Sequence, residues 1–244
     1  MTLKSKIVWK EGLTFDAHLD DPVRMLRRIE KFVRPLNPPV SSFENRIRLS
    51  PFRILISVLL SSRTKDPVTE KASERLFTVA DTPETMAELP EDAIRRLIYP
   101  VGFYRKKAKN IGEICRILIA SAVFPNTFET LTALPGVGRK TANLVLSLAF
   151  ARPAIAVDTH VFRISRRLRW ATGRTPQEVE TELKERFPVR RWNGINYTLV
   201  GFGQTVCKPR NPLCGICVIR GTCPYFQSVE MKKELTDLRL IPGL

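Results

Sequence analysis

The chain has 244 residues, which allows one large or two modest domains with a substantial hydrophobic core. Hydrophobic residues make up 43%, and no apolar run approaches the roughly 18 residues of a membrane span, so the composition excludes an integral membrane protein. A formal net charge of +16 favours a polyanionic partner, although charge by itself does not separate nucleic acid from an anionic membrane surface.

A capping side chain followed by proline recurs along the chain and predicts where helices start. The pairs are Asp21-Pro22, Ser50-Pro51, Asp66-Pro67, Thr82-Pro83 and Thr175-Pro176. Apolar residues then recur at helical spacing, for example from Phe52 to Leu60 and from Ile111 to Leu118. Alternating patterns typical of strands are scarce. We therefore expect an all-α protein, with breaks at residues 36–42 and at Arg152-Pro153.

Residues 134–150 read LPGVGRKTANLVLSLAF and predict a tight turn followed by a helix that begins at about Arg139. Gly136 and Gly138 permit a turn whose amides, next to a helix N-terminus, suit a phosphate oxygen. Such a contact positions DNA without reading its sequence. An ordinary connection between two packed helices would use the glycines equally well, but the basic pair Arg139-Lys140 favours binding.

Two residues near this turn carry functional groups that suit catalysis. Lys140 lies in the first turn of the helix and is a candidate amine nucleophile, although a solvated lysine that touches phosphate gives the same pattern. Asp158, in the segment IAVDTH, precedes the helical sequence VFRISRRLRW and is a candidate N-cap. Its carboxylate could also stabilise positive charge that develops on a sugar during glycosidic cleavage, or move a proton.

Four of the five cysteines lie within residues 207–223, with the spacing C-x6-C-x2-C-x5-C. A loop this short can place all four sulfurs around a single zinc ion or around an iron–sulfur cubane. The N-terminal sequence lacks the apolar core of a signal peptide, so we expect a reducing compartment and no disulfides. The fifth cysteine, Cys115, lies in an apolar helical run and is expected to be an inert core thiol.

The chain resembles the endonuclease III family of DNA repair glycosylases, which belongs to the helix-hairpin-helix superfamily. The resemblance rests on three motifs in the same order: LPGVGRKTA, then VDTH, then the cysteine spacing. The resemblance covers roughly residues 50–225. It implies two helical domains with a DNA-binding cleft between them: a six-helix barrel with the helix-hairpin-helix at 45–152, and a cluster domain formed by 1–44 and 153–244. It also implies a 4Fe–4S cluster rather than zinc. The ligands would be Cys207, Cys214, Cys217 and Cys223.

The resemblance implies roles for the residues around the turn. Lys140 would attack C1′ of the damaged nucleotide, expel the base and leave a Schiff base, whose β-elimination nicks the strand. Asp158 would be its essential carboxylate partner. Because the target base inside a duplex is out of reach, the nucleotide must be flipped out. The phosphate-binding turn would consist of Gly136, Val137, Gly138 and Arg139.

Further contacts are implied outside the turn. Arg63 and Phe103 lie in two loops that would fill the gap left by the flipped nucleotide, whereas a surface arginine and a core phenylalanine are the simpler alternatives. Lys208 and Arg210 lie between the first two cysteines and would face phosphates. Asp66 also has the sequence of an N-cap. The pocket candidates are Ser61, Asp66 and His160.

We therefore expect a base-excision repair enzyme, a bifunctional DNA N-glycosylase that removes oxidised or damaged pyrimidines and acts as an AP lyase. Its partner would be double-stranded DNA with damaged bases or abasic sites, bound by a monomer away from membranes. We expect it in the cytoplasm at the nucleoid, or in the nucleus or an organelle if the source is eukaryotic.

One residue departs from the family pattern, because glutamine is usual where Arg63 stands and some mismatch-specific relatives have arginine. A monofunctional glycosylase for thymine or uracil opposite guanine is therefore one alternative. A non-catalytic DNA-binding iron–sulfur protein is another.

Overall fold

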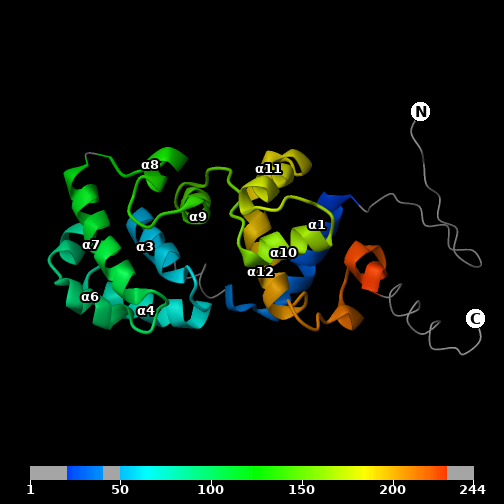
Figure 1. Cartoon of the computed structure of the whole chain (residues 1–244), viewed down its shortest axis with the longest axis horizontal. Helices are drawn as coiled ribbons and strands as arrows, with labels where there is room; N and C mark the ends of the chain where they lie inside the picture. Colours follow the sequence, from blue (N-terminus) through cyan, green and yellow to red (C-terminus); the bar gives the residue numbers. More distant parts are fainter. Residues whose placement is uncertain (1–20, 41–49, 122, 230–244) are drawn as a thin grey trace, which may run out of the picture.

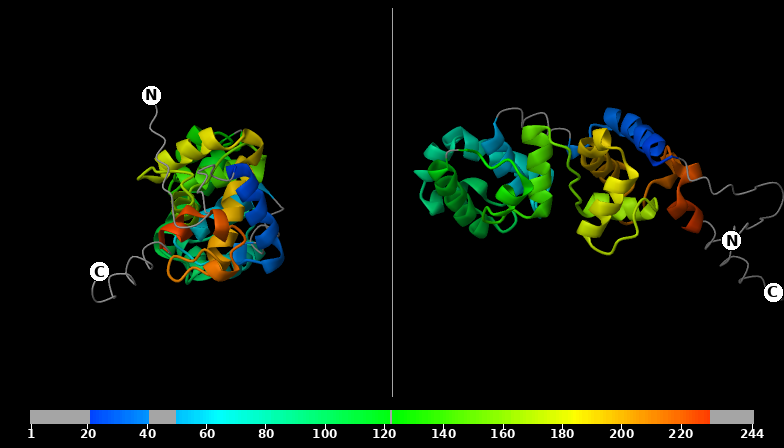
Figure 2. Two further views of the ribbon diagram at one scale, coloured as in Figure 1. Left: turned by 90° about the vertical axis from the view of Figure 1, so that its right-hand side faces the viewer. Right: turned by 90° about the horizontal axis from the view of Figure 1, so that it is seen from above.

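The computed structural model describes residues 21–40, 50–121 and 123–229. Every regular element in these residues is a helix and none is a strand, so the predicted all-α class is confirmed. Figure 1 shows two lobes side by side along the long axis of the molecule, and the right-hand view in Figure 2 shows the same division. No helix within the described ranges is long and apolar enough to cross a membrane.

The first lobe consists of consecutive helices around one hydrophobic core. They are α3 (Pro51–Ser61), α4 (Asp66–Val79), α5 (Pro83–Ala87), α6 (Glu91–Ile98), α7 (Tyr104–Ala120), α8 (Phe128–Thr132) and α9 (Arg139–Phe150). The most apolar of them, α3, contacts α4, α7 and α9 and buries nearly all its side chains in this core. Cys115 of α7 is fully buried, and burial raises the pKa of its thiol to about 12, as expected for an inert core thiol.

The second lobe joins the N-terminal helix to the C-terminal part of the chain. It contains α1 (Pro22–Val33), η1 (Arg34–Leu36), α10 (Thr159–Arg167), α11 (Pro176–Arg186), η2 (Val189–Arg191), α12 (Trp192–Thr205), η3 (Cys214–Ile216) and η4 (Arg220–Thr222). Its separate core includes Trp170 packed edge-on against Phe187, with ring centroids 5.0 Å apart. Arg28 of α1 donates to the carbonyl oxygen of Val218 at 2.6 Å, which ties α1 to the cysteine loop.

The two cores agree with a two-domain organisation, but the predicted bounds of 45–152, and of 1–44 with 153–244, stay a prediction. The first bound falls in residues 41–49, outside the described residues. Across the junction, Arg139 of α9 forms an ion pair at 3.2 Å with Glu180 of α11, a buried carboxylate that Lys184 also contacts at 2.6 Å. The N-terminus of α9 is thereby fixed against the second lobe.

Local sequence signals placed four of the five predicted helix starts correctly. In each case the side chain accepts a hydrogen bond from a backbone amide of the first helical turn; the residues are Asp21, Ser50, Thr82 and Thr175. Asp66 does not cap α4, because the helix includes it and Lys65 occupies the N-cap position. The Asp66 carboxylate instead accepts from Gln204 Nε2 of α12 at 2.6 Å, which directs it toward the other lobe.

Candidate active site

The predicted turn lies between α8 and α9. Gly136 has a φ of 76°, which favours glycine, and a Cβ there would collide with the side-chain amide of Asn110 on α7. Gly138 is exposed and occupies the N-cap of α9 without a side-chain acceptor, so the first amides of α9 receive no capping bond from it. Such amides suit an anion.

The neighbours of the two glycines are more engaged with the protein than the sequence suggested. Val137 is buried, and its amide donates to the carbonyl oxygen of Leu134 at 3.1 Å. Its contribution is therefore to the shape of the turn. Arg139 pairs with Glu180 and lies over the Phe128 ring at 4.6 Å, which holds its guanidinium at the junction of the lobes.

A cleft of about 810 Å³ lies between residues of the two lobes. Its first wall comes from the segment after α3, the start of α4 and the first turn of α9, and its second wall from α10, α11 and α12. It brings together predicted residues that are distant in the sequence. Those that line it are Ser61, Arg63, Asp66, Lys140, Asp158 and His160.

Asp158 has the capping geometry that its sequence context predicted. Its Oδ1 accepts from the amide of His160 at 2.9 Å and from that of Val161 at 2.8 Å, at the start of α10. Both capping bonds use the same oxygen, so the carboxylate can cap the helix and still face the cleft. Lys140, half-buried in the first turn of α9, lines the same cleft. Each lobe thus supplies one of the two candidate catalytic groups from a helix N-terminus.

His160 lies in the cleft wall. Burial, with a smaller contribution from the charges of Arg163 and Lys140, lowers the pKa of its imidazole against the opposing effect of Asp158 and Asp66. A neutral imidazole is therefore favoured. Its Nδ1 is 3.2 Å from Arg163 Nη2, which also donates to the carbonyl oxygen of Cys207 at 2.9 Å.

Gln204 is a cleft residue that the sequence analysis missed. Its Nε2 donates to Asp66, and its Oε1 accepts from the amide of Val40 at 3.2 Å. The Asp66 carboxylate is therefore oriented by a side chain 138 residues away. No local spacing rule connects positions that are so distant.

Arg63 and Phe103 belong to neighbouring loops, and both have left-handed backbone conformations, with φ of 52° and 56°. The Arg63 guanidinium lies 5.7 Å from the centroid of the Phe103 ring. Phe103 is 63% exposed, so the alternative of a core phenylalanine is wrong. Its ring is instead mostly exposed to solvent, with the Arg63 guanidinium on one face.

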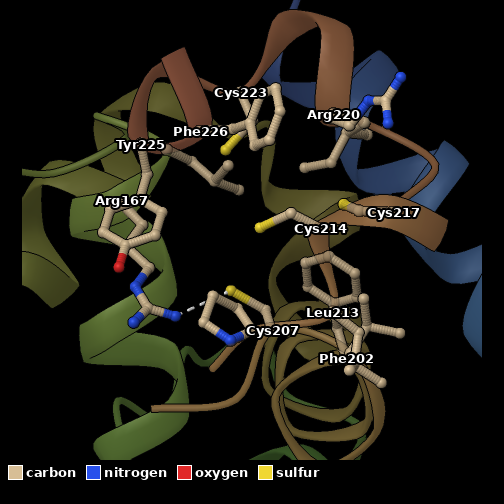
Figure 3. Close-up of a pocket in the computed structure, with 14 residues that line it drawn as sticks. Arg167, Phe202, Cys207, Leu213, Cys214, Cys217, Arg220, Cys223, Tyr225 and Phe226 are labelled. Carbon is tan, nitrogen blue, oxygen red and sulfur yellow. Dashed lines mark hydrogen bonds between the residues drawn. The ribbon is translucent and has the colours of Figure 1, made fainter. Parts of the chain in front are cut away.

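The cysteine loop forms a second site in the second lobe. The thiols of Cys207, Cys214, Cys217 and Cys223 border one pocket, shown in Figure 3. Within the described residues no three His, Cys, Asp or Glu side chains are arranged as ligands of a single metal ion. The remaining lining is mainly apolar, with Leu168, Phe202, Val206, Leu213, Ile219, Tyr225 and Phe226. Four sulfurs in an apolar pocket are a donor set that fits an iron–sulfur cluster.

Arg167 fixes the first part of this loop. Its guanidinium donates to Cys207 Sγ at 3.3 Å and to the carbonyl oxygens of Lys208 and Pro209 at 2.8 and 3.0 Å. It also lies over the Tyr225 ring at 4.2 Å. The side chains of Lys208 and Arg210 are exposed, and their contact with phosphates stays a prediction.

Burial raises the pKa of Cys217 to about 11, and it raises the pKa of Cys223 against the opposing effect of backbone hydrogen bonds. Thiolates are the form that binds iron, so a bound cluster would supply the positive charge that stabilises them.

Comparison with known proteins identifies the family. Residues 56–189 match the HhH-GPD superfamily of base excision DNA repair proteins, and residues 207–223 match the iron-sulfur binding domain of endonuclease III. The endonuclease III of Thermotoga maritima is 48% identical over 185 residues, which cover 75% of this chain and 87% of that protein. The chain belongs to the endonuclease III family. The endonuclease III of Escherichia coli K12 is 41% identical over 184 residues, 75% of this chain and 87% of that protein.

Solved structures support the same family. The chain matches the structure of a trapped endonuclease III–DNA covalent intermediate with a TM-score of 0.76 at 34% identity, and the match covers 85% of this chain and 96% of the chain in that structure. A thermostable thymine-DNA glycosylase has a TM-score of 0.65 at 24% identity, covers 83% of this chain and 98% of its own, and shares the fold.

Family membership confirms the predicted enzyme class. The chain is a DNA-binding base-excision repair enzyme of the endonuclease III type, a DNA glycosylase and AP lyase. Its four clustered cysteines form the 4Fe–4S binding domain of endonuclease III. The zinc site and the non-catalytic protein are therefore set aside.

Proposed function

We propose that this enzyme removes oxidised or fragmented pyrimidines from double-stranded DNA, with Lys140 as nucleophile and Asp158 as its carboxylate partner. The supporting observation is that α9 and α10, one from each lobe, present an amine and a carboxylate to the same cleft. At about 810 Å³ the cleft is in the size range of pockets for small ligands, which suits a single flipped nucleotide.

In the proposed reaction the neutral amine of Lys140 attacks C1′ of the flipped nucleotide. The N-glycosidic bond breaks, and the base leaves with the bonding electrons and takes up a proton. Ring opening gives a Schiff base between Lys140 and C1′. Loss of a C2′ proton then breaks the bond between C3′ and its oxygen, which nicks the strand, and water releases the lysine. The Asp158 carboxylate stabilises positive charge on the sugar and transfers protons.

The cluster has a structural part in this proposal. When bound by the four cysteines, it cross-links the loop that carries Lys208 and Arg210. These exposed cations would contact the DNA backbone, as would the amides of Gly136 and Gly138.

Borohydride trapping tests the proposal. The wild-type enzyme, incubated with duplexes that contain thymine glycol or an abasic site, should form a reduced covalent complex. Lys140→Gln should bind the same duplexes without being trapped. Release of thymine glycol by Lys140→Gln at the wild-type rate would contradict the assignment of the nucleophile.

A mismatch specificity is the second candidate, because Arg63 replaces the usual glutamine and lines the cleft. It predicts that the wild-type enzyme releases thymine or uracil opposite guanine faster than thymine glycol. The same duplex panel, with Arg63→Gln beside the wild type, separates the two specificities.

We also propose that the enzyme acts as a monomer, because the two lobes of one chain supply the whole cleft. Sedimentation with and without a duplex should give one protein chain per complex. Its relatives include bacterial proteins and a chloroplastic protein from Arabidopsis thaliana, so we propose that it acts where a genome lies: at the nucleoid, in the nucleus or in an organelle.

A further inference from the structure

Lys107, in the first turns of α7, is a buried cation that the proposed reaction does not use. It is 6% exposed. Its ammonium donates to the carbonyl oxygen of Leu60 at 2.9 Å, to that of Ser62 at 2.6 Å and to Thr64 Oγ1 at 3.5 Å. All three acceptors belong to the segment that ends α3 and forms a wall of the cleft. A charged lysine is rarely buried to this extent unless it is hydrogen-bonded, since desolvation opposes the charge.

The acceptors explain why a cation is needed at this place. The last carbonyl groups of a helix lack intrahelical donors and carry the negative end of the helix dipole. At the end of α3, Lys107 supplies the missing donors from another helix, in a position where glycine or a nearby basic residue often serves. The contacts from Lys107 therefore add to the local hydrogen bonds of segment 61–64, such as that from the Thr64 amide to the carbonyl oxygen of Ser61 at 3.1 Å.

The same network reaches the second loop. Thr64 Oγ1 donates to the carbonyl oxygen of Ser62 at 3.2 Å and accepts from the amide of Gly102 at 3.1 Å. A Cβ on Gly102 would collide with the carbonyl oxygen of Arg63, so the two loops are in direct backbone contact. The Arg63 guanidinium also contacts one face of the Phe103 ring, with 5.7 Å between the guanidinium carbon and the ring centroid. The loops 61–64 and 101–103 thus form one unit with Lys107 beneath it.

We propose that Lys107 is a positioning residue for base excision, which holds the loops 61–64 and 101–103 together so that Arg63 and Phe103 enter the duplex as one element. The role of these two side chains rests on the proposed function. Lys107 itself is not among the residues that line the cleft, whereas Ser61, Ser62, Arg63 and Thr64 are. It acts through them and does not touch the nucleotide.

The test compares Lys107→Met with Lys109→Met, which removes the same charge from an exposed position of α7. Single-turnover excision of thymine glycol and the Kd for the same duplex are measured for both. Circular dichroism and the absorption of the bound cluster establish that each variant is folded.

Lys107→Met should lose about 10–100-fold in excision rate, because a shift of about 1 Å in a positioning element has effects of this size. Its Kd should change by less than about threefold, since backbone contacts supply most of the affinity. Lys109→Met should keep the wild-type rate within about threefold. Fluorescence of 2-aminopurine placed beside the lesion should show less unstacking with Lys107→Met alone.

An excision rate for folded Lys107→Met within about threefold of the wild type would overturn the proposal, as would equal losses in both variants. If Lys107→Met does not fold, the excision rate of Thr64→Val tests the proposal, because this variant removes the hydroxyl that contacts both Lys107 and the loop 101–103. An unchanged rate for Thr64→Val would then overturn the proposal. Absence of borohydride trapping by the wild type would instead refute the proposed function, so the two failures are distinguishable.

Discussion

Replacing Asp158 by alanine removes both the α10 cap and the proposed catalytic carboxylate, whereas replacing it by asparagine removes only the charge. Oδ1 accepts two backbone amides, at 2.9 and 2.8 Å, and an asparagine oxygen can do the same. Loss of such a cap costs about 0.5–2 kcal/mol, and loss of the charge at a helix N-terminus about 0.3–1 kcal/mol. Alanine should therefore destabilise the enzyme by about 1–3 kcal/mol, and asparagine by less than about 1 kcal/mol.

The measurements are Tm by circular dichroism and single-turnover excision under one set of conditions. For a chain of this size, Asp158→Ala should lower Tm by roughly 3–9 °C and Asp158→Asn by roughly 1–3 °C. Both should lose about 10²-fold or more in excision rate, as expected for a charge-stabilising or proton-transferring group. If Asp158→Asn kept its rate within about tenfold, the carboxylate would be a cap only. Equal destabilisation by both would refute the capping geometry.

Three further predictions concern other parts of the molecule. Burial and the charge of Lys140 lower the pKa of Lys107 from 10.5 to about 8, so the unfolded chain binds more protons than the folded chain between these pH values. The stability of the wild type relative to Lys107→Met should therefore rise by about 1–2 kcal/mol from about pH 7 to 9.5 in urea titrations, after allowance for solvent screening. A difference that does not change with pH would contradict the shift. Gly136→Ala, strained by its φ and blocked by Asn110, should lower stability by about 1–3 kcal/mol and weaken binding to undamaged duplex; unchanged Tm and Kd would refute the described turn. Arg167→Met removes the hydrogen bond to Cys207 Sγ and should weaken iron retention against a chelator about tenfold, whereas unchanged retention would show that this contact is dispensable.

Local signals in the sequence were sufficient for much of the helical fold. Ser50 and Thr82 cap the helices they were expected to cap, because a hydroxyl next to proline favours that geometry over only a few residues. The turn at Gly136 and the cap at Asp158 were predictable for the same reason.

The rest depends on contacts between distant segments. Asp66 has the local pattern of a cap, yet its carboxylate binds Gln204 across the cleft, since a tertiary hydrogen bond competes with the capping one. In the sequence, Lys107 is one of several lysines at the start of α7. Its burial is evident only in the folded structure, where its ammonium contacts the end of α3. The first role follows from packing between the lobes and the second from packing of α7 against α3 within one lobe, and no spacing within the sequence specifies either.

Peptide mapping of the borohydride-trapped complex tests the catalytic assignment most directly. After reaction with an abasic duplex, reduction and nuclease digestion, mass spectrometry should find the sugar adduct on a single peptide, at Lys140. Lys140→Gln should give no adduct while retaining the duplex. An adduct at another lysine or at the N-terminal amine, or base release by the wild type without any adduct, would contradict the assignment of Lys140 as the nucleophile.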